Sequence, residues 1–258
     1  MDLHLAEKVA IVTGASRGIG RSIAETLSAE GMPVVLVARS LDDLESVASS
    51  LTAPSFVLAV DLRDDGAPEL VVRSTIDRFG RIDLLVNNAG DTKRGDFLDL
   101  TDDDWAQGFS LKFRSAMRCC REAWPYLKES RGSIVNIAGI GGRTGSAEFT
   151  IGGTVNAALL NLTKALADRG VRDGVRVNAV NPSSIATDRL TSRVRRVAED
   201  RGIDESVAAT EMAGRLRVSR FGRPDEVAHV VAFLASEAAS GYCNGSIVDV
   251  DGGQTRTL

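Results

Sequence analysis

Short apolar runs alternate with amphipathic stretches along almost the whole chain. Residues 9–12 are wholly apolar and partly β-branched, which is typical of a strand buried on both faces of a sheet. After a glycine-rich turn, Ile19, Ile23 and Leu27 recur at helical spacing and predict a helix that ends near Gly31. The alternation then continues, and the predicted strands cover residues 9–12, 33–38, 55–60, 84–86, 133–137, 175–180 and 247–250.

Helices are predicted between these strands. Thr101 and Asp104 form a capping-box pattern, which starts a helix that runs to about residue 128 with a bend at Pro125. The other predicted helices include residues 41–51, 68–79, 155–166 and 224–234. Strands that alternate with helices predict an α/β fold, a single-domain, Rossmann-like, doubly wound seven-stranded parallel sheet over residues 1–258.

Composition and charge argue against several classes of binding partner. The 258 residues carry a net charge of −4, which gives no electrostatic reason to expect a nucleic acid or an anionic membrane. No apolar run reaches the roughly 18 residues that a membrane span needs. Cys119, Cys120 and Cys243 lack metal-ligand spacing and predict reduced thiols in a cytoplasmic protein. His4 and His229 are far apart, so we expect no histidine metal site and no Ser-His-Asp triad.

The first strand, the glycine turn and the first helix together suggest a phosphate site. Gly14, Gly18 and Gly20 let the backbone approach a pyrophosphate, and the N-terminus of the following helix offers free N–H groups and a positive dipole end. The alternative interpretation is an ordinary glycine turn that joins two elements.

The spacing of this turn, Thr-Gly-x-x-x-Gly-x-Gly, resembles the nucleotide turn of the short-chain dehydrogenase/reductase family. Three later segments are similar to that family's landmarks and follow in the same order: Asn87–Gly90, Asn178–Pro182 and Val250–Gly253. The resemblance covers nearly the whole chain, and it implies a dinucleotide-binding enzyme that acts on a small-molecule substrate. Family members are commonly homotetramers or homodimers, so we expect a homo-oligomer.

The resemblance also implies which residues bind the cofactor. The expected set is Gly14, Ser16, Arg17, Gly18, Ile19, Gly20, Arg39, Asp61, Leu62, Asn88, Ala89, Gly90, Pro182, Ile185 and Thr187. Arg39 stands at the end of the second strand, where an NAD-binding protein carries a carboxylate. Arg39 and Arg17 suit a 2′-phosphate, so we expect NADP(H) to be preferred over NAD(H). The alternative for each arginine is a solvated surface charge.

The catalytic residues that the resemblance implies are replaced. The family's Tyr position holds Gly152, its Lys position holds Asn156, and its paired Ser positions hold Ala138 and Gly139. The family's Asn position holds Lys112, so the ammonium group has moved from one helix to another. We expect the two glycines to make room beside the substrate.

Three functions remain open at this point. The first is an NADP(H)-dependent oxidoreductase for a carbonyl/alcohol substrate with a rearranged site, in which Lys112 and Asn156 act and Lys112 donates the proton. The second is a non-redox, lysine-dependent enzyme on the same fold. The third is a catalytically silent NADP(H)-binding protein. Residues 183–220 correspond to the family's substrate lid, and their many charges suggest a solvated cover.

Overall fold

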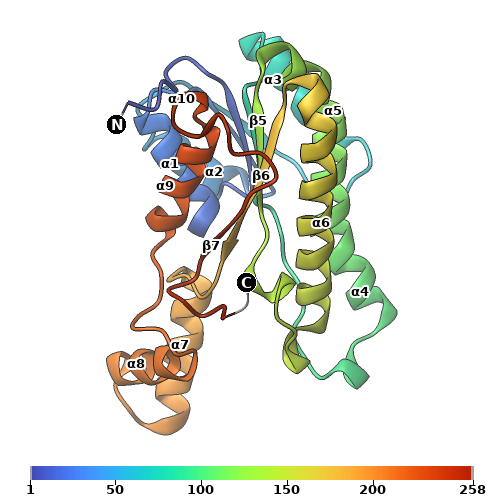
Figure 1. Ribbon diagram of the computed structural model, residues 1–258. Helices are drawn as coiled ribbons and strands as arrows, with labels where there is room; N and C mark the ends of the chain where they lie inside the picture. The colour runs from blue at the N-terminus through green and yellow to red at the C-terminus, as the bar shows by residue number, and fades with distance from the viewer. Residues whose placement is uncertain (1, 257–258) are drawn as a thin grey trace.

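The computed structural model describes residues 2–256, and its centre is a seven-stranded parallel sheet (Figure 1). The strand order is β3-β2-β1-β4-β5-β6-β7, which confirms the predicted Rossmann-like α/β fold. The strands are β1 (Ala10–Thr13), β2 (Val34–Ala38), β3 (Ser55–Ala59), β4 (Leu84–Asn87), β5 (Ser133–Ile137), β6 (Arg176–Pro182) and β7 (Ile247–Val250). Parallel strands need crossover connections, and a helix supplies most of them.

Helices cover both faces of the sheet. In Figure 1, α1, α2 and α9 lie on one side and α3, α5 and α6 on the other. Two buried clusters fill the layers, one around Ile23, Leu44 and Val231, the other around Val71 and Leu127. The helices are α1 (Gly18–Ala29), α2 (Leu41–Ala48), α3 (Ala67–Phe79), α4 (Asp102–Phe109), α5 (Ser115–Ser130), α6 (Thr150–Asp173), α7 (Asp188–Arg201), α8 (Glu205–Arg215), α9 (Pro224–Ala235) and α10 (Glu237–Ser240).

The region between β4 and β5 differs most from the sequence-based expectation. The predicted helix over residues 101–128 is divided by a π-helical turn, Ser110–Arg114, and the chain continues as α5 through Pro125 to Ser130. The expected capping box of Thr101 and Asp104 is present. The helix therefore changes pitch before α5, a feature that is frequent at functional sites, and Pro125 lies inside α5.

The segment over residues 183–220 holds two helices, α7 and α8. They stand at the carboxyl end of the sheet, away from the helices that cover its faces (Figure 1). Leu190, Val194 and Ala208 form a small apolar cluster that joins α7 to α8. Within residues 2–256, no helix combines the length and the apolar character that crossing a membrane requires.

Buried polar side chains tie the central strands to α6. The amide of Asn87 on β4 donates to Asn136 Oδ1 on β5 (2.9 Å), and the amide of Asn136 donates to Thr163 Oγ1 on α6 (2.9 Å). These two bonds fix the relative positions of β4, β5 and α6, although Asn87 Oδ1 has no hydrogen-bond partner among the described residues. The carboxyl ends of β4 and β5 are thus held rigidly where the order of the strands reverses beside β1, the place where open α/β sheets bind ligands.

Candidate active site

A cavity of about 970 Å³ runs along the carboxyl ends of the strands. Its walls come from the turn after β1, the ends of β2 and β3, the loops after β4 and β5, and the first turn of α7. Of the residues expected to bind a cofactor, these line the cavity: Gly14, Ser16, Arg17, Gly18, Ile19, Gly20, Arg39, Asp61, Leu62, Asn88, Ala89, Gly90, Pro182 and Thr187. Ile185 does not line this cavity. Its side chain is buried in the core, and its backbone bridges to Gly222.

The turn after β1 requires its glycines. Gly14 has a φ of +66°, and a Cβ on Gly20 would lie 2.1 Å from the carbonyl oxygen of Gly14. A Cβ on Gly18 would lie 3.2 Å from Thr187 Cγ2. No side chain caps the N-terminus of α1, so its first N–H groups face the cavity without a capping partner. This cradle fits the pyrophosphate of a dinucleotide.

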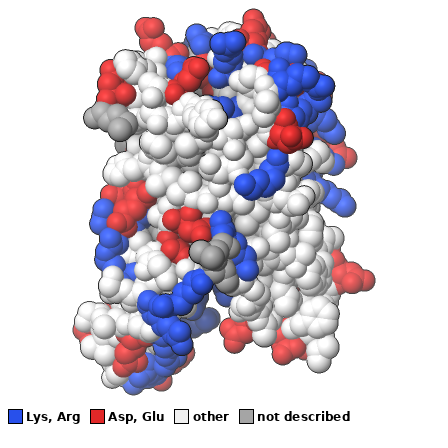
Figure 2. Space-filling model, in the orientation of Figure 1, with Lys and Arg blue, Asp and Glu red and all other residues white. Residues whose placement is uncertain are grey.

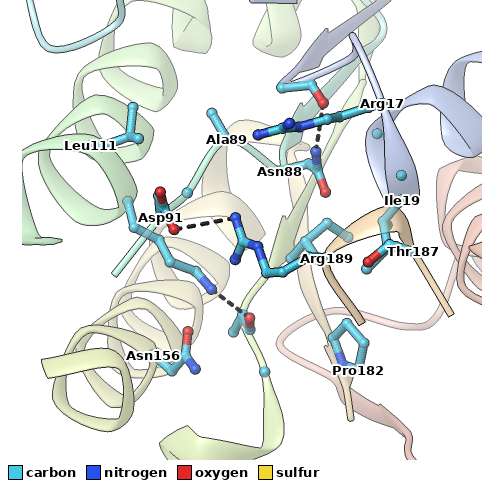
Figure 3. A pocket seen from close by; sticks show the side chains of 18 of the residues that line it. Arg17, Ile19, Asn88, Ala89, Asp91, Leu111, Asn156, Pro182, Thr187 and Arg189 are labelled. Atoms are coloured by element: carbon cyan, nitrogen blue, oxygen red, sulfur yellow. Dashed lines mark hydrogen bonds and ion pairs between the residues drawn. The ribbon is translucent and has the colours of Figure 1, made fainter. Parts of the chain in front are cut away.

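Thr13 and Asn88 lock the turn to β4. Thr13 Oγ1 accepts hydrogen bonds from the backbone N–H groups of Asn88 (2.9 Å) and Ala89 (3.0 Å). The Asn88 amide donates to the carbonyls of Thr13 (3.0 Å) and Gly14 (3.1 Å); Figure 3 shows Asn88 beside Arg17 in this part of the site. Thr13 was missing from the expected set, although it begins the glycine motif.

The end of the cavity near β2 carries two arginine side chains. Arg17 and Arg39 both line it, and neither forms an ion pair within residues 2–256. Asp61 also lines it, but its carboxylate is paired with Arg63, whose Nη2 lies 2.5 Å from Asp61 Oδ2. The hydrogen bond from Arg63 lowers the pKa of Asp61. Two free guanidinium groups together suit a phosphate monoester.

Lys112 points inward from the π-helical turn. Its Nζ donates to the carbonyl oxygen of Ala138 at the end of β5 (2.7 Å). Its aliphatic stem lies over Gly90, where a Cβ would be 2.9 Å from Lys112 Cδ. Burial, and then the positive charge of Arg189, lower the pKa of Lys112 to about 8. The Lys112 side chain lines the cavity, so it is not a solvated surface lysine.

Asn156 lines the same part of the cavity from α6. It is 3% exposed, and its Oδ1 has no hydrogen-bond partner within the described residues. A Cβ on Gly139, whose φ is +149°, would lie 2.9 Å from Asn156 Nδ2. The two residues are therefore packed together, and the unpaired acceptor of Asn156 is the kind of buried polar atom that a ligand satisfies.

The expectation that Gly152 makes room is wrong. A Cβ on Gly152 would lie 2.0 Å from Cζ of Phe149, so the phenyl ring fills that space and Gly152 does not line the cavity. The Arg94 guanidinium stands 4.1 Å from the centroid of the same ring. Neither Phe149 nor Arg94 is among the residues expected from the sequence. Nothing in the local pattern indicates that the Phe149 ring packs onto Gly152 in the first turn of α6.

Comparison with known proteins places the chain in a family. A family model described as enoyl-(acyl carrier protein) reductase matches residues 14–255. The meso-2,3-butanediol dehydrogenase of Serratia marcescens is 34% identical over 257 residues, which cover 98% of this chain and 96% of that protein. The chain belongs to the short-chain dehydrogenase/reductase family. It is also similar to the short-chain reductase protein NovJ of Streptomyces niveus, with 36% identity over 96% of this chain and 94% of the relative.

Solved members of the family have the same fold. L-sorbose reductase from Gluconobacter frateurii, solved in complex with NADPH and L-sorbose, superposes with a TM-score of 0.95 at 33% identity, and the match covers both chains completely. YwfH, an NADPH-dependent reductase involved in bacilysin biosynthesis, gives a TM-score of 0.89 at 30% identity, covering 97% of this chain and 99% of that chain. Both relatives are NADPH enzymes by their descriptions.

Proposed function

We propose that this chain is an NADP(H)-dependent oxidoreductase that interconverts a carbonyl and an alcohol, with Lys112 handling the proton. The observation that carries the proposal is the position of Lys112: its ammonium group lies in the cavity, anchored on Ala138, with a pKa of about 8. A group with a pKa close to the working pH both gives and takes protons efficiently.

The residues around the cavity fit the cofactor. The glycine turn and the N-terminus of α1 would hold the pyrophosphate, Arg17 and Arg39 the 2′-phosphate, Asp61 and Leu62 the adenine, and Asn88–Gly90, Pro182 and Thr187 the nicotinamide half. When bound, the nicotinamide supplies or accepts the hydride. The preference for NADP(H) over NAD(H) rests on Arg39, since no carboxylate stands at the end of β2 to repel a 2′-phosphate.

The side chains of the site divide the remaining work. Below a pH of about 8 Lys112 is cationic, so it can donate a proton to the carbonyl oxygen during reduction. As the free amine it can accept the alcohol proton in the reverse direction. The Ala138 carbonyl fixes the direction of Nζ, and Asn156 lines the same cavity from α6. Positioned acid–base catalysis of this kind is worth about 10²–10⁴-fold in rate.

The proposal includes a lid. The segment over residues 183–220 contributes Arg189 and Arg193 to the cavity wall, and Arg189 pairs with Asp91 on the loop after β4 (3.2 Å). Figure 3 shows Asp91 and Arg189 facing each other, with Asn156 below them in the view. Both partners are largely exposed, so the link is weak and suits a cover that opens and closes.

The decisive experiment replaces the ammonium group. We expect Lys112→Met to lower kcat for carbonyl reduction by about 10²–10⁴-fold, with NADPH affinity within a few-fold of the wild type. Lys164→Met, which removes an exposed lysine of α6 outside the cavity, is the matched control and should leave turnover unchanged. NADPH oxidation is followed by absorbance, and cofactor affinity by fluorescence titration.

The other outcomes distinguish the alternatives. Unchanged turnover in Lys112→Met contradicts the assigned role. A borohydride-trapped substrate adduct on Lys112 indicates a lysine-dependent, non-redox enzyme. NADPH binding without turnover of any compound in a broad carbonyl panel indicates a silent binder.

A further inference from the structure

Three arginines converge at the end of the cavity where Lys112 and Asn156 lie. Arg94 comes from the loop after β4, and Arg189 and Arg193 come from successive turns of α7. All three line the cavity. Figure 2 shows Lys and Arg gathered on the α7–α8 segment beside the hollow in this face of the molecule. Neither Arg94 nor Arg193 forms an ion pair within residues 2–256.

Arg94 is held in place but not neutralised. Its guanidinium carbon stands 4.1 Å from the centroid of the Phe149 ring, a cation–π contact that restricts the position of the group. Its N–H groups have no hydrogen-bond acceptor among the described residues. Because the guanidinium is planar and presents its N–H groups as a fork, Arg94 can still bind an anion through two parallel hydrogen bonds.

The charges around Arg94 favour an anion. Partial burial and the nearby charges of Arg193 and Arg189 lower the pKa of Arg94, and the Glu148 carboxylate only partly opposes them. Asp91 is paired with Arg189, and Asp188 is the other acidic residue of this part of the wall. Like charges gathered at one place repel each other, and a bound anion removes that repulsion.

The subsite lies next to the reacting centre. Phe149, which carries Arg94 on its ring, fills the space beside Gly152, and Arg189 is close enough to lower the pKa of Lys112. An anion between Arg94 and Arg193 would therefore lie in the same cavity as a carbonyl group placed at Lys112.

We propose that Arg94, Arg193 and Arg189 form a subsite for a carboxylate of the substrate, so that the enzyme acts on oxo acids or the corresponding hydroxy acids. This inference rests on the proposed function for the reaction, but the anion subsite can be tested without turnover. The other source of an anion is the cofactor's own pyrophosphate, and the experiment separates the two.

The first arm compares matched substrates. Wild-type protein should prefer oxo acids over their ethyl esters, for example acetoacetate over ethyl acetoacetate. Arg94→Met should lower the acid-over-ester ratio of kcat/KM by about 10- to 100-fold, because a charge-assisted pair is lost. Arg196→Met removes an exposed arginine of α7 that does not line the cavity, and it should leave that ratio unchanged. Equal loss for acid and ester, together with weaker NADPH binding, assigns the arginines to the pyrophosphate and overturns the proposal.

The second arm needs no catalysis. Malonate and the neutral malonamide are titrated calorimetrically into the protein with and without NADP⁺. We expect malonate to bind, malonamide not to bind, and Arg94→Met to weaken malonate binding by at least about 10-fold. Equal binding of malonate by wild type and Arg94→Met overturns the subsite even if the enzyme reduces neutral carbonyls. If malonate binding depends on Arg94 but the protein reduces no carbonyl compound, the subsite is supported and the proposed reaction is rejected.

Discussion

The two halves of the cavity are built in different ways. The half that we assign to the adenosine and pyrophosphate is made largely from backbone, namely the glycine turn after β1, the uncapped start of α1 and the Thr13–Asn88 latch. The half around Lys112 is made from side chains that reach in from separate elements. A backbone cradle tolerates little change in its glycines, whereas a side-chain site can exchange its chemistry by substitution.

Close contacts in the two halves illustrate the difference. A Cβ on Gly20 would meet the backbone of Gly14, which cannot move without opening the turn. The three atoms nearest a Cβ on Gly152 would all belong to the Phe149 ring, and a side chain gives way more readily than backbone. The first half is therefore the harder one to alter.

The largest effect is expected at Gly20. Gly20→Ala places a methyl group 2.1 Å from the Gly14 carbonyl, so we expect the turn to open and NADPH to bind about 100-fold more weakly. Gly66→Ala is the control, because a Cβ there meets nothing within 4 Å. Fluorescence titration measures both affinities, and an unchanged value for Gly20→Ala would show that the turn does not hold the cofactor.

The next largest effect is expected from reversing the charge of Arg39. Arg39→Asp replaces a guanidinium with a carboxylate beside the proposed 2′-phosphate, so we expect NADPH to bind about 30-fold more weakly. NADH lacks that phosphate and serves as the internal control, with its affinity unchanged or improved. Parallel losses for NADPH and NADH would contradict the proposed preference.

The pH dependence tests the other half of the cavity. Lysine is cationic below its pKa, and the pKa of Lys112 is about 8, so the proton available for reduction is lost as the pH rises through that value. We expect kcat for reduction to fall roughly 10-fold between pH 7 and pH 9. Lys112→Arg stays cationic over this range, so its residual activity should be flat. A wild-type profile without this step would exclude Lys112 as the proton donor.

The smallest effect is expected at Gly152. Gly152→Ala pushes the Phe149 ring aside, which should lower the free energy of unfolding by about 1 kcal/mol, at the low end of overpacking costs. Gly214→Ala, where a Cβ on α8 meets nothing within 4 Å, should leave stability unchanged or raise it. Urea unfolding compares the two, and equal stabilities would show that the ring is not confined by Gly152.

Much of the fold could be predicted from the chain alone. Both ends of every strand lie within two residues of their predicted positions, because short, mainly apolar runs bounded by glycine or polar residues have few other solutions in an α/β protein. The π-helical turn at Ser110–Arg114 could not be predicted, since its residues look like ordinary helix. Ile185 was expected at the cofactor because the resemblance implied it, yet its side chain packs into the core.

The sequence by itself determined the seven-stranded sheet and the glycine turn after β1, and its resemblance to the family directed attention to Lys112 and Asn156. Those features depend on local periodicity and on motif spacing, which are written in consecutive residues. Only the tertiary structure decided that Lys112 turns inward onto Ala138, that Phe149 fills the space at Gly152, and that Arg94 and Arg193 line one cavity. These contacts join segments far apart in the chain or depend on side-chain direction, and their energies come from packing and charge that no local pattern encodes.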